Sequence, residues 1–115
     1  ASDVYKRQSL KDALIKITEK KLGVTLVLNH EKVVGIFTDG DLRRCLNNEI
    51  QLNETLIGDV MTSKFKGIAS DALAIDAAEI MEKNKVFTLV VHPSSSENSK
   101  YGIITMHQLL EAGIV

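Results

Sequence analysis

The stretch GIFTDGDLRR, residues 35–44, joins an apolar run to a charged segment. We expect a strand to end and a helix to begin within it. Residues 33–37, Val-Val-Gly-Ile-Phe, have the β-branched and aromatic composition of a strand. Gly35 has no side chain, so another backbone or a ligand ring can come close to the strand at that point. Thr38 or Asp39 then caps the helix that follows.

The start of this helix has a chemistry that suits a nucleotide. A helix N-terminus exposes free amide groups and a partial positive charge, which favour a phosphate. Asp41 would repel a phosphate, so we expect its carboxylate to accept charge-assisted hydrogen bonds from neutral donors, such as two ribose hydroxyls. Thr38 and the helix amides then bind the phosphate, and Arg43 or Arg44 offsets the local negative charge. The alternative is purely structural: an acidic helix cap followed by a solvated arginine face.

The chain contains an internal repeat. Residues 9–28 resemble residues 72–91 at an offset of 63, with apolar positions spaced as on one face of a helix. Gly35-Ile-Phe-Thr then matches Gly102-Ile-Ile-Thr at an offset of 67. Each copy is therefore expected to contain a helix, a strand, a short turn, a strand and a second helix. Because neither copy alone buries enough surface, we expect the two to pack sheet to sheet as a pseudo-symmetric α+β pair.

Four segments are expected. Residues 1–8 show neither periodicity nor a cap and resemble a translated sequencing-adapter remnant or a frayed terminus, so we exclude them from the fold. Without them, repeat 1 lacks the leading strand that residues 65–69 would supply to repeat 2. The segments are 1–8, the artefact or frayed terminus; 9–50, the truncated repeat 1; 51–64, a linker with a short helix; and 65–115, repeat 2.

Composition excludes several classes of protein. The chain has 115 residues, of which 44% are hydrophobic and 25% are charged, and this composition is ordinary for a globular protein. Its net charge of −1 gives no broad positive electrostatic potential that would attract nucleic acid or an anionic membrane. The apolar runs are far shorter than a membrane span requires. The single cysteine, Cys45, cannot form an internal disulfide, which fits a cytoplasmic location. Its spacing from the three histidines does not indicate a metal site, and no catalytic grouping is evident.

Residues 34–42, VGIFTDGDL, resemble the signature of the CBS domain, a tandem βαββα module that binds adenosine-type nucleotides in the cleft between paired copies. By this resemblance, Thr38 and Asp41 are the signature threonine and aspartate of repeat 1. In repeat 2, Thr105 matches the threonine, but Gln108 replaces the acid and binds a hydroxyl more weakly. Repeat 1 is therefore the expected stronger site. The complete expected nucleotide site comprises Gly35, Thr38, Asp39, Asp41, Arg43, Arg44, Thr105, His107 and Gln108, with no catalytic and no metal residue.

The longer string GIFTDGDLRR, together with the ending MHQLLEAGIV, resembles the C-terminal CBS pair of arabinose 5-phosphate isomerases of the KpsF/GutQ type. In that family an N-terminal sugar-isomerase (SIS) domain interconverts ribulose 5-phosphate and arabinose 5-phosphate for Kdo, lipopolysaccharide or capsule synthesis. The resemblance implies a non-catalytic regulatory module that needs no cofactor and responds to AMP, ATP or CMP-Kdo, in a homo-oligomer.

Two alternatives remain open at this point. The pair could bind no ligand and act as a dimerisation scaffold through apolar positions such as Leu46, Leu110 and Ile114. It could also be a stand-alone CBS regulator of another protein.

Overall fold

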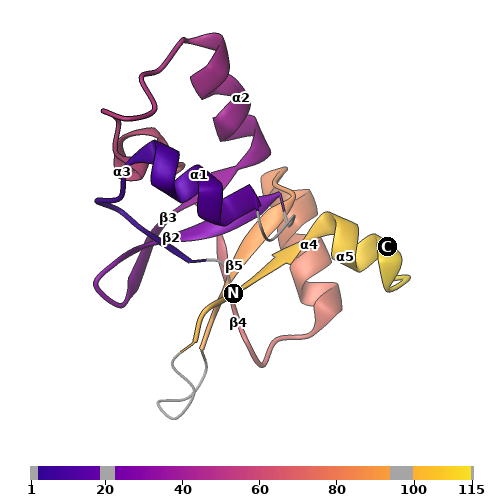
Figure 1. The fold of residues 1–115 in the computed structure, drawn as a ribbon. Coiled ribbons are helices and arrows are strands. Elements are labelled where there is room, and N and C mark those ends of the chain that lie inside the picture. Colours follow the sequence, from indigo (N-terminus) through magenta and orange to yellow (C-terminus); the bar gives the residue numbers. More distant parts are fainter. Residues whose placement is uncertain (1–2, 19–22, 94–99, 115) are drawn as a thin grey trace. The chain divides into compact units, whose positions relative to one another are not determined.

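The structure is a computed structural model that describes residues 3–18, 23–93 and 100–114, and its chain forms two units, Ala1–Lys64 and Phe65–Val115 (Figure 1). Each unit contains one of the two sequence repeats. We describe each by itself as unit 1 and unit 2.

Unit 1 contains a three-stranded sheet in the order β1-β2-β3. Its strands are β1 (Val4–Tyr5), β2 (Val24–Asn29) and β3 (Lys32–Thr38). The first two are parallel, whereas β2 and β3 form an antiparallel hairpin. The central strand β2 is buried along its first four residues, which explains its continuous apolar sequence.

Strand β1 corrects one expectation. Repeat 1 was expected to lack its first strand, but Val4 pairs with Val27, and Tyr5 pairs with Leu28. Val4 is fully buried in the same core cluster as Phe37. Sequence periodicity could not reveal this strand, because two residues are too few to show a period. The expectation that residues 1–8 are an adapter remnant concerns their origin and stays a prediction; residues 1–2 lie outside the described part.

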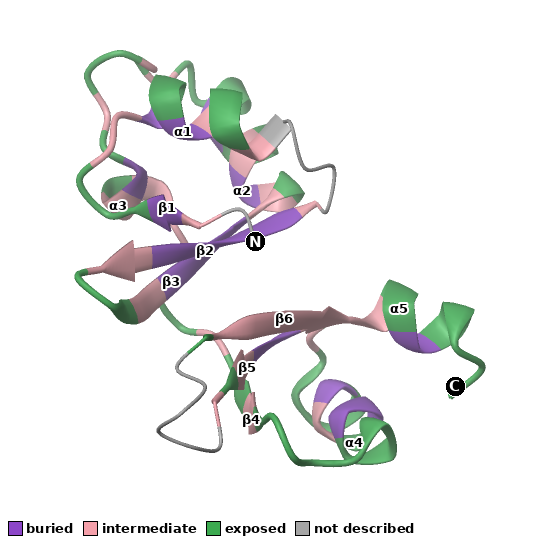
Figure 2. Ribbon diagram, turned by 60° about the horizontal axis from the view of Figure 1, so that its bottom comes forward, coloured by how far each residue is buried: buried purple, intermediate pink, exposed green. Residues whose placement is uncertain are grey.

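The helices of unit 1 are α1 (Leu10–Thr18), α2 (Asp39–Asn47) and the short α3 (Ile57–Val60). The predicted turn of helix in the linker is therefore confirmed as α3. Figure 2 shows buried residues along β2 and on the side of α1 that faces the sheet. The core cluster consists of Val4, Leu10, Ala13, Val27, Phe37, Cys45 and Ile57.

The linker is part of unit 1. Its backbone hydrogen-bonds to the N-terminal end of the repeat, with Leu10 N donating to Thr55 O at 2.6 Å and Ile57 N donating to Gln8 O at 2.9 Å. Thr62 forms an isolated antiparallel bridge with Ile36 on β3. These bonds fix the linker against the sheet up to the last few residues before unit 2.

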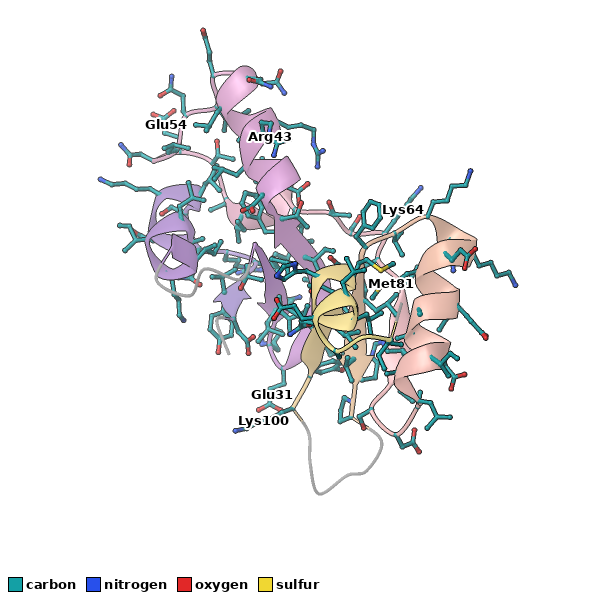
Figure 3. All side chains as sticks on the ribbon, turned by 90° about the vertical axis from the view of Figure 1, so that its right-hand side faces the viewer. Glu31, Arg43, Glu54, Lys64, Met81 and Lys100 are labelled. Atoms are coloured by element: carbon teal, nitrogen blue, oxygen red, sulfur yellow. The ribbon has the colours of Figure 1, made fainter. Side chains whose placement is uncertain are left out.

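Unit 2 repeats the topology of unit 1. Its sheet has the order β4-β5-β6, with a parallel first pair and an antiparallel second pair. The strands are β4 (Gly67–Ala69), β5 (Thr88–His92) and β6 (Gly102–Thr105), and the helices are α4 (Ala74–Asn84) and α5 (Met106–Glu111). The core cluster consists of Ala77, Ala78, Met81, Leu89 and Leu109, of which Met81 is labelled in Figure 3.

The expected mixed α+β class and the duplicated βαββα order are confirmed by these elements. Within residues 3–18, 23–93 and 100–114, no helix has both the length and the apolar character needed to cross a membrane.

Candidate functional site

The candidate site begins where β3 ends and α2 starts. Thr38 is the N-cap of α2, which settles the choice between Thr38 and Asp39. Its hydroxyl accepts a hydrogen bond from Asp41 N at 3.2 Å, and the Asp41 carboxylate accepts one from Thr38 N at 2.9 Å. This reciprocal pair is a capping box, which satisfies two amide groups that the helix alone would leave unpaired.

Asp41 is buried, with 2% of its surface exposed. Besides the capping box, its carboxylate accepts a hydrogen bond from Thr62 Oγ1, at 2.9 Å to one oxygen and 3.1 Å to the other. It also forms an ion pair with Arg44. A buried carboxylate needs such partners, because desolvation without them would be costly. The Asp41 carboxylate is therefore held by groups of unit 1 itself.

Thr62 was not among the expected site residues. It lies 21 residues from Asp41 in the sequence, in the segment 51–64 that was expected to be a linker with a short helix. The available signal was Gly35, at which a close backbone approach was expected. A Cβ atom on Gly35 would lie 2.9 Å from the Thr62 carbonyl oxygen and 2.5 Å from Met61 Sδ. The backbone that comes close to Gly35 is that of the linker.

The two arginines of the motif differ. The Arg44 side chain is 66% exposed but bends back to Asp41, three residues earlier on the same helix. Arg43 lies on α2 (Figure 3) and is exposed, so its guanidinium is accessible to an anion. Of the two, Arg44 offsets the negative charge of Asp41.

A pocket of about 170 Å³ adjoins the start of α2. It brings Thr38 and Asp39 together with apolar side chains of α1, but Asp41, Arg43 and Arg44 do not line it. Its volume is below the roughly 300 Å³ at which small-molecule sites begin. The lining residues are Leu14, Ile17, Gly23, Phe37, Thr38, Asp39 and Leu42.

The corresponding turn of unit 2 has the same backbone pattern and a different electrostatic character. Thr105 caps α5, and Gln108 Oε1 accepts a hydrogen bond from Thr105 N at 2.9 Å. Gln108 is exposed and neutral, in contrast to the buried, charged Asp41. His107 is also exposed and contacts Glu111 on the following turn. The two repeats therefore share a capping box, whereas the buried carboxylate is found in repeat 1.

Cys45 lies on α2 one turn after Asp41 and is buried. Burial raises the pKa of its thiol above the ordinary value of 9.0; the Asp41 carboxylate adds to the rise, and Arg44 opposes it. The thiol is thus a packing group rather than a nucleophile. Among the described residues, no group of three or more histidine, cysteine, aspartate and glutamate side chains could bind a metal ion.

We expect iodoacetamide at pH 8 to alkylate Cys45 at least about ten-fold more slowly in the folded protein than in urea, because the folded thiol is shielded and protonated. Because the pKa of the Cys45 thiol is higher in the folded than in the unfolded protein, the thiol contributes to the free energy of unfolding at pH values below its pKa in the unfolded protein. This contribution is lost as the pH rises through its pKa in the folded protein. Mass spectrometry of timed samples gives both rates. Equal rates would show that Cys45 is accessible.

The chain matches the family model described as "CBS domain" over residues 4–48 and 57–114. It is 44% identical over 108 residues to arabinose 5-phosphate isomerase KdsD of Pseudomonas aeruginosa, which is 93% of this chain and 32% of that enzyme. The chain thus spans about a third of the length of the curated relatives it matches.

Two solved structures have similar folds. A CBS domain protein of Pyrobaculum aerophilum complexed with AMP has a TM-score of 0.78 at 14% identity, covering 98% of this chain and 91% of that one. The CBS domain pair of protein MJ0100, in complex with 5′-methylthioadenosine and S-adenosyl-L-methionine, has a TM-score of 0.78 at 20% identity, covering 96% and 89%. At these identities the likeness concerns the fold alone.

Proposed function

The chain belongs to the CBS domain family as a tandem pair, and from this we propose that it is a nucleotide-binding regulatory module. The observation that carries the proposal is the start of α2, where a helix N-terminus, a threonine cap and a carboxylate with an arginine partner occur together in repeat 1. Two proteins of the same fold were solved with adenosine-type ligands, which supports this ligand class.

The ligand chemistry follows from the residues at this turn. Thr38 and the positive end of the α2 helix dipole suit a phosphate. The Asp39 and Asp41 amides already donate to Gly23 O and Thr38 Oγ1, so the exposed Arg43 is the accessible donor and adds a positive charge. Asp41 is the acceptor proposed for ribose hydroxyls. In repeat 2 the neutral Gln108 would make weaker hydrogen bonds, so repeat 1 is the proposed primary site. His107 and Thr105 complete the weaker site.

The proposed parent protein is an arabinose 5-phosphate isomerase, because the similarity to KdsD extends over 93% of the chain. In that setting the module would regulate an attached SIS domain that carries out catalysis in the cytoplasm. A ligand changes activity only if it binds two arrangements of the module with different affinity. CMP-Kdo is a candidate effector besides AMP and ATP, since it lies downstream in the pathway proposed for the parent enzyme.

Isothermal calorimetry of the purified chain with AMP, ATP, CMP and CMP-Kdo tests the proposal. We expect saturable binding of at least one of them. At a concentration 100-fold above its dissociation constant, that ligand should raise the free energy of unfolding by about 2.7 kcal/mol. If none of the four gives heat or stabilisation, and circular dichroism shows a folded sample, the module does not bind these nucleotides.

A second candidate function is homo-oligomer assembly. Three large apolar side chains expected at such a face are exposed: Leu46 at 60%, Leu110 at 56% and Ile114 at 40%. Burial of such side chains is the usual driving force for association of copies. A folded sample that sediments as a dimer and binds none of the four nucleotides would favour this second function.

A further inference from the structure

The carboxylate of Asp41 is saturated with donors. Among the described residues it accepts hydrogen bonds from Thr38 N, Thr38 Oγ1, Thr62 Oγ1 and the Arg44 guanidinium. A carboxylate has about four lone-pair positions. The side chain of Asp41 is also only 1% exposed. A ligand hydroxyl can therefore bond to Asp41 only after one of these donors has left.

The donors differ in how readily they can leave. The two from Thr38 belong to the cap of α2, and their loss would open the first turn of the helix. Arg44 is largely exposed, so it can turn into water and free one position. Thr62 Oγ1 lies within 3.1 Å of both carboxylate oxygens. Because a ribose presents two neighbouring hydroxyls, the second hydroxyl needs the position that Thr62 occupies.

Thr62 is attached to the sheet at the point where the linker leaves unit 1. Its carbonyl oxygen accepts a hydrogen bond from Ile36 N at 2.9 Å, and its amide donates to Ile36 O at 2.8 Å. Only two residues then precede Phe65, where unit 2 begins. A change in the bonding of Thr62 therefore acts on the segment that joins the two units.

We infer that the Thr62 hydroxyl and a ligand's hydroxyl pair compete for the Asp41 carboxylate, so that binding at repeat 1 releases the linker at Thr62. This inference rests on the proposed nucleotide site. It makes Thr62 a residue that sets ligand affinity and transmits occupancy to the linker. In the described part of unit 2, the Gln108 side chain accepts hydrogen bonds from Thr105 alone, so repeat 2 has no comparable competition.

Thr62→Val tests the competition, because valine keeps the β-branched shape and removes the hydroxyl donor. Without its competitor, Asp41 has an unfilled acceptor position in the free protein. We expect AMP to bind Thr62→Val about ten-fold more tightly than wild type in calorimetry, since a hydrogen bond to a charged group is no longer broken on binding.

Ser63→Ala is the matched control. Ser63 is the exposed neighbour of Thr62 in the same linker, and we expect its replacement to leave AMP affinity within about two-fold of wild type. A ten-fold effect in both variants would show that any change in the linker affects binding, which would overturn the specific role of Thr62.

Amide hydrogen exchange gives a second readout. We expect AMP to accelerate exchange of the Thr62 and Ile36 amides in wild type. Tighter binding of AMP to Thr62→Val together with this acceleration supports the inference. Binding of AMP to Thr62→Val when wild type does not bind AMP supports it as well. If wild type binds AMP but Thr62→Val binds equally or more weakly, the competition is wrong and the nucleotide site stands. If neither binds AMP, both the site for this nucleotide and the competition fail.

Discussion

Asp41→Ala is expected to lower the free energy of unfolding by about 2–4 kcal/mol and to abolish nucleotide binding. The substitution removes the carboxylate half of the α2 capping box, although the Thr38 cap itself remains, and leaves the Thr38 amide and the Thr62 hydroxyl without their acceptor. Arg44 loses its partner, but its side chain is 66% exposed and can be hydrated, so it adds little to the loss. Urea unfolding followed by far-ultraviolet circular dichroism measures the change.

Gln108→Ala is the control for Asp41→Ala, because Gln108 has the corresponding place in repeat 2. Its capping box is exposed and uncharged, and we expect a loss below about 1 kcal/mol. Equal losses in the two variants would contradict the claim that the two repeats differ at this turn.

Gly35→Ala is expected to lower the free energy of unfolding by about 1–3 kcal/mol, although alanine is the smallest possible addition. The new Cβ would lie 2.5 Å from Met61 Sδ and 2.9 Å from the Thr62 carbonyl oxygen. Met61 can turn away, but the carbonyl is part of the backbone bridge to Ile36 and cannot move without breaking it. The same urea titration measures the loss.

Gly102→Ala is the matched control, since Gly102 is the equivalent residue of repeat 2. Its nearest neighbour would be Val91 Cβ at 3.6 Å, an ordinary contact. We expect no loss, or a gain of up to about 1 kcal/mol because alanine restricts the unfolded chain more than glycine does. If Gly35→Ala is as harmless as Gly102→Ala, the linker does not pack on β3 as described.

Most of the fold could be predicted because its signals are local. The apolar positions at helical spacing indicated α1 and α4, and the two Gly-x-x-Thr turns indicated the ends of β3 and β6. The duplication made each assignment of a helix or strand more secure, because the same order of elements had to fit the sequences of both repeats. Strand β1 was missed because its two residues are recognised only through their partner strand and their burial.

The candidate site could be predicted only in part. Thr38 and Asp41 are three residues apart, and a threonine followed by an acid at that spacing predicts a capping box directly. The contact between Asp41 and Thr62 spans 21 residues and depends on how the linker returns to the sheet. Sequence patterns of one element carry no information on such a contact. The burial of Asp41 follows from that tertiary arrangement and could not be predicted either.

Repeat 1 and repeat 2 illustrate how one backbone motif can have two electrostatic outcomes. The Asp41 carboxylate can be buried because the Arg44 guanidinium and the hydroxyls of Thr38 and Thr62 compensate its charge. The side-chain amide of Gln108 is neutral, requires no such partners and is exposed. The proposed difference in nucleotide affinity between the repeats depends on this contrast.

The central claim is that a nucleotide binds at the start of α2 in repeat 1. A ¹H–¹⁵N NMR titration of the purified chain with AMP tests it residue by residue. We predict saturable shifts of the amide signals of residues 38–44 and of Thr62, with smaller shifts at residues 105–108. Saturable shifts confined to other parts of the chain, or no shifts in a folded sample at millimolar AMP and, in turn, at millimolar ATP, CMP and CMP-Kdo, would contradict the claim.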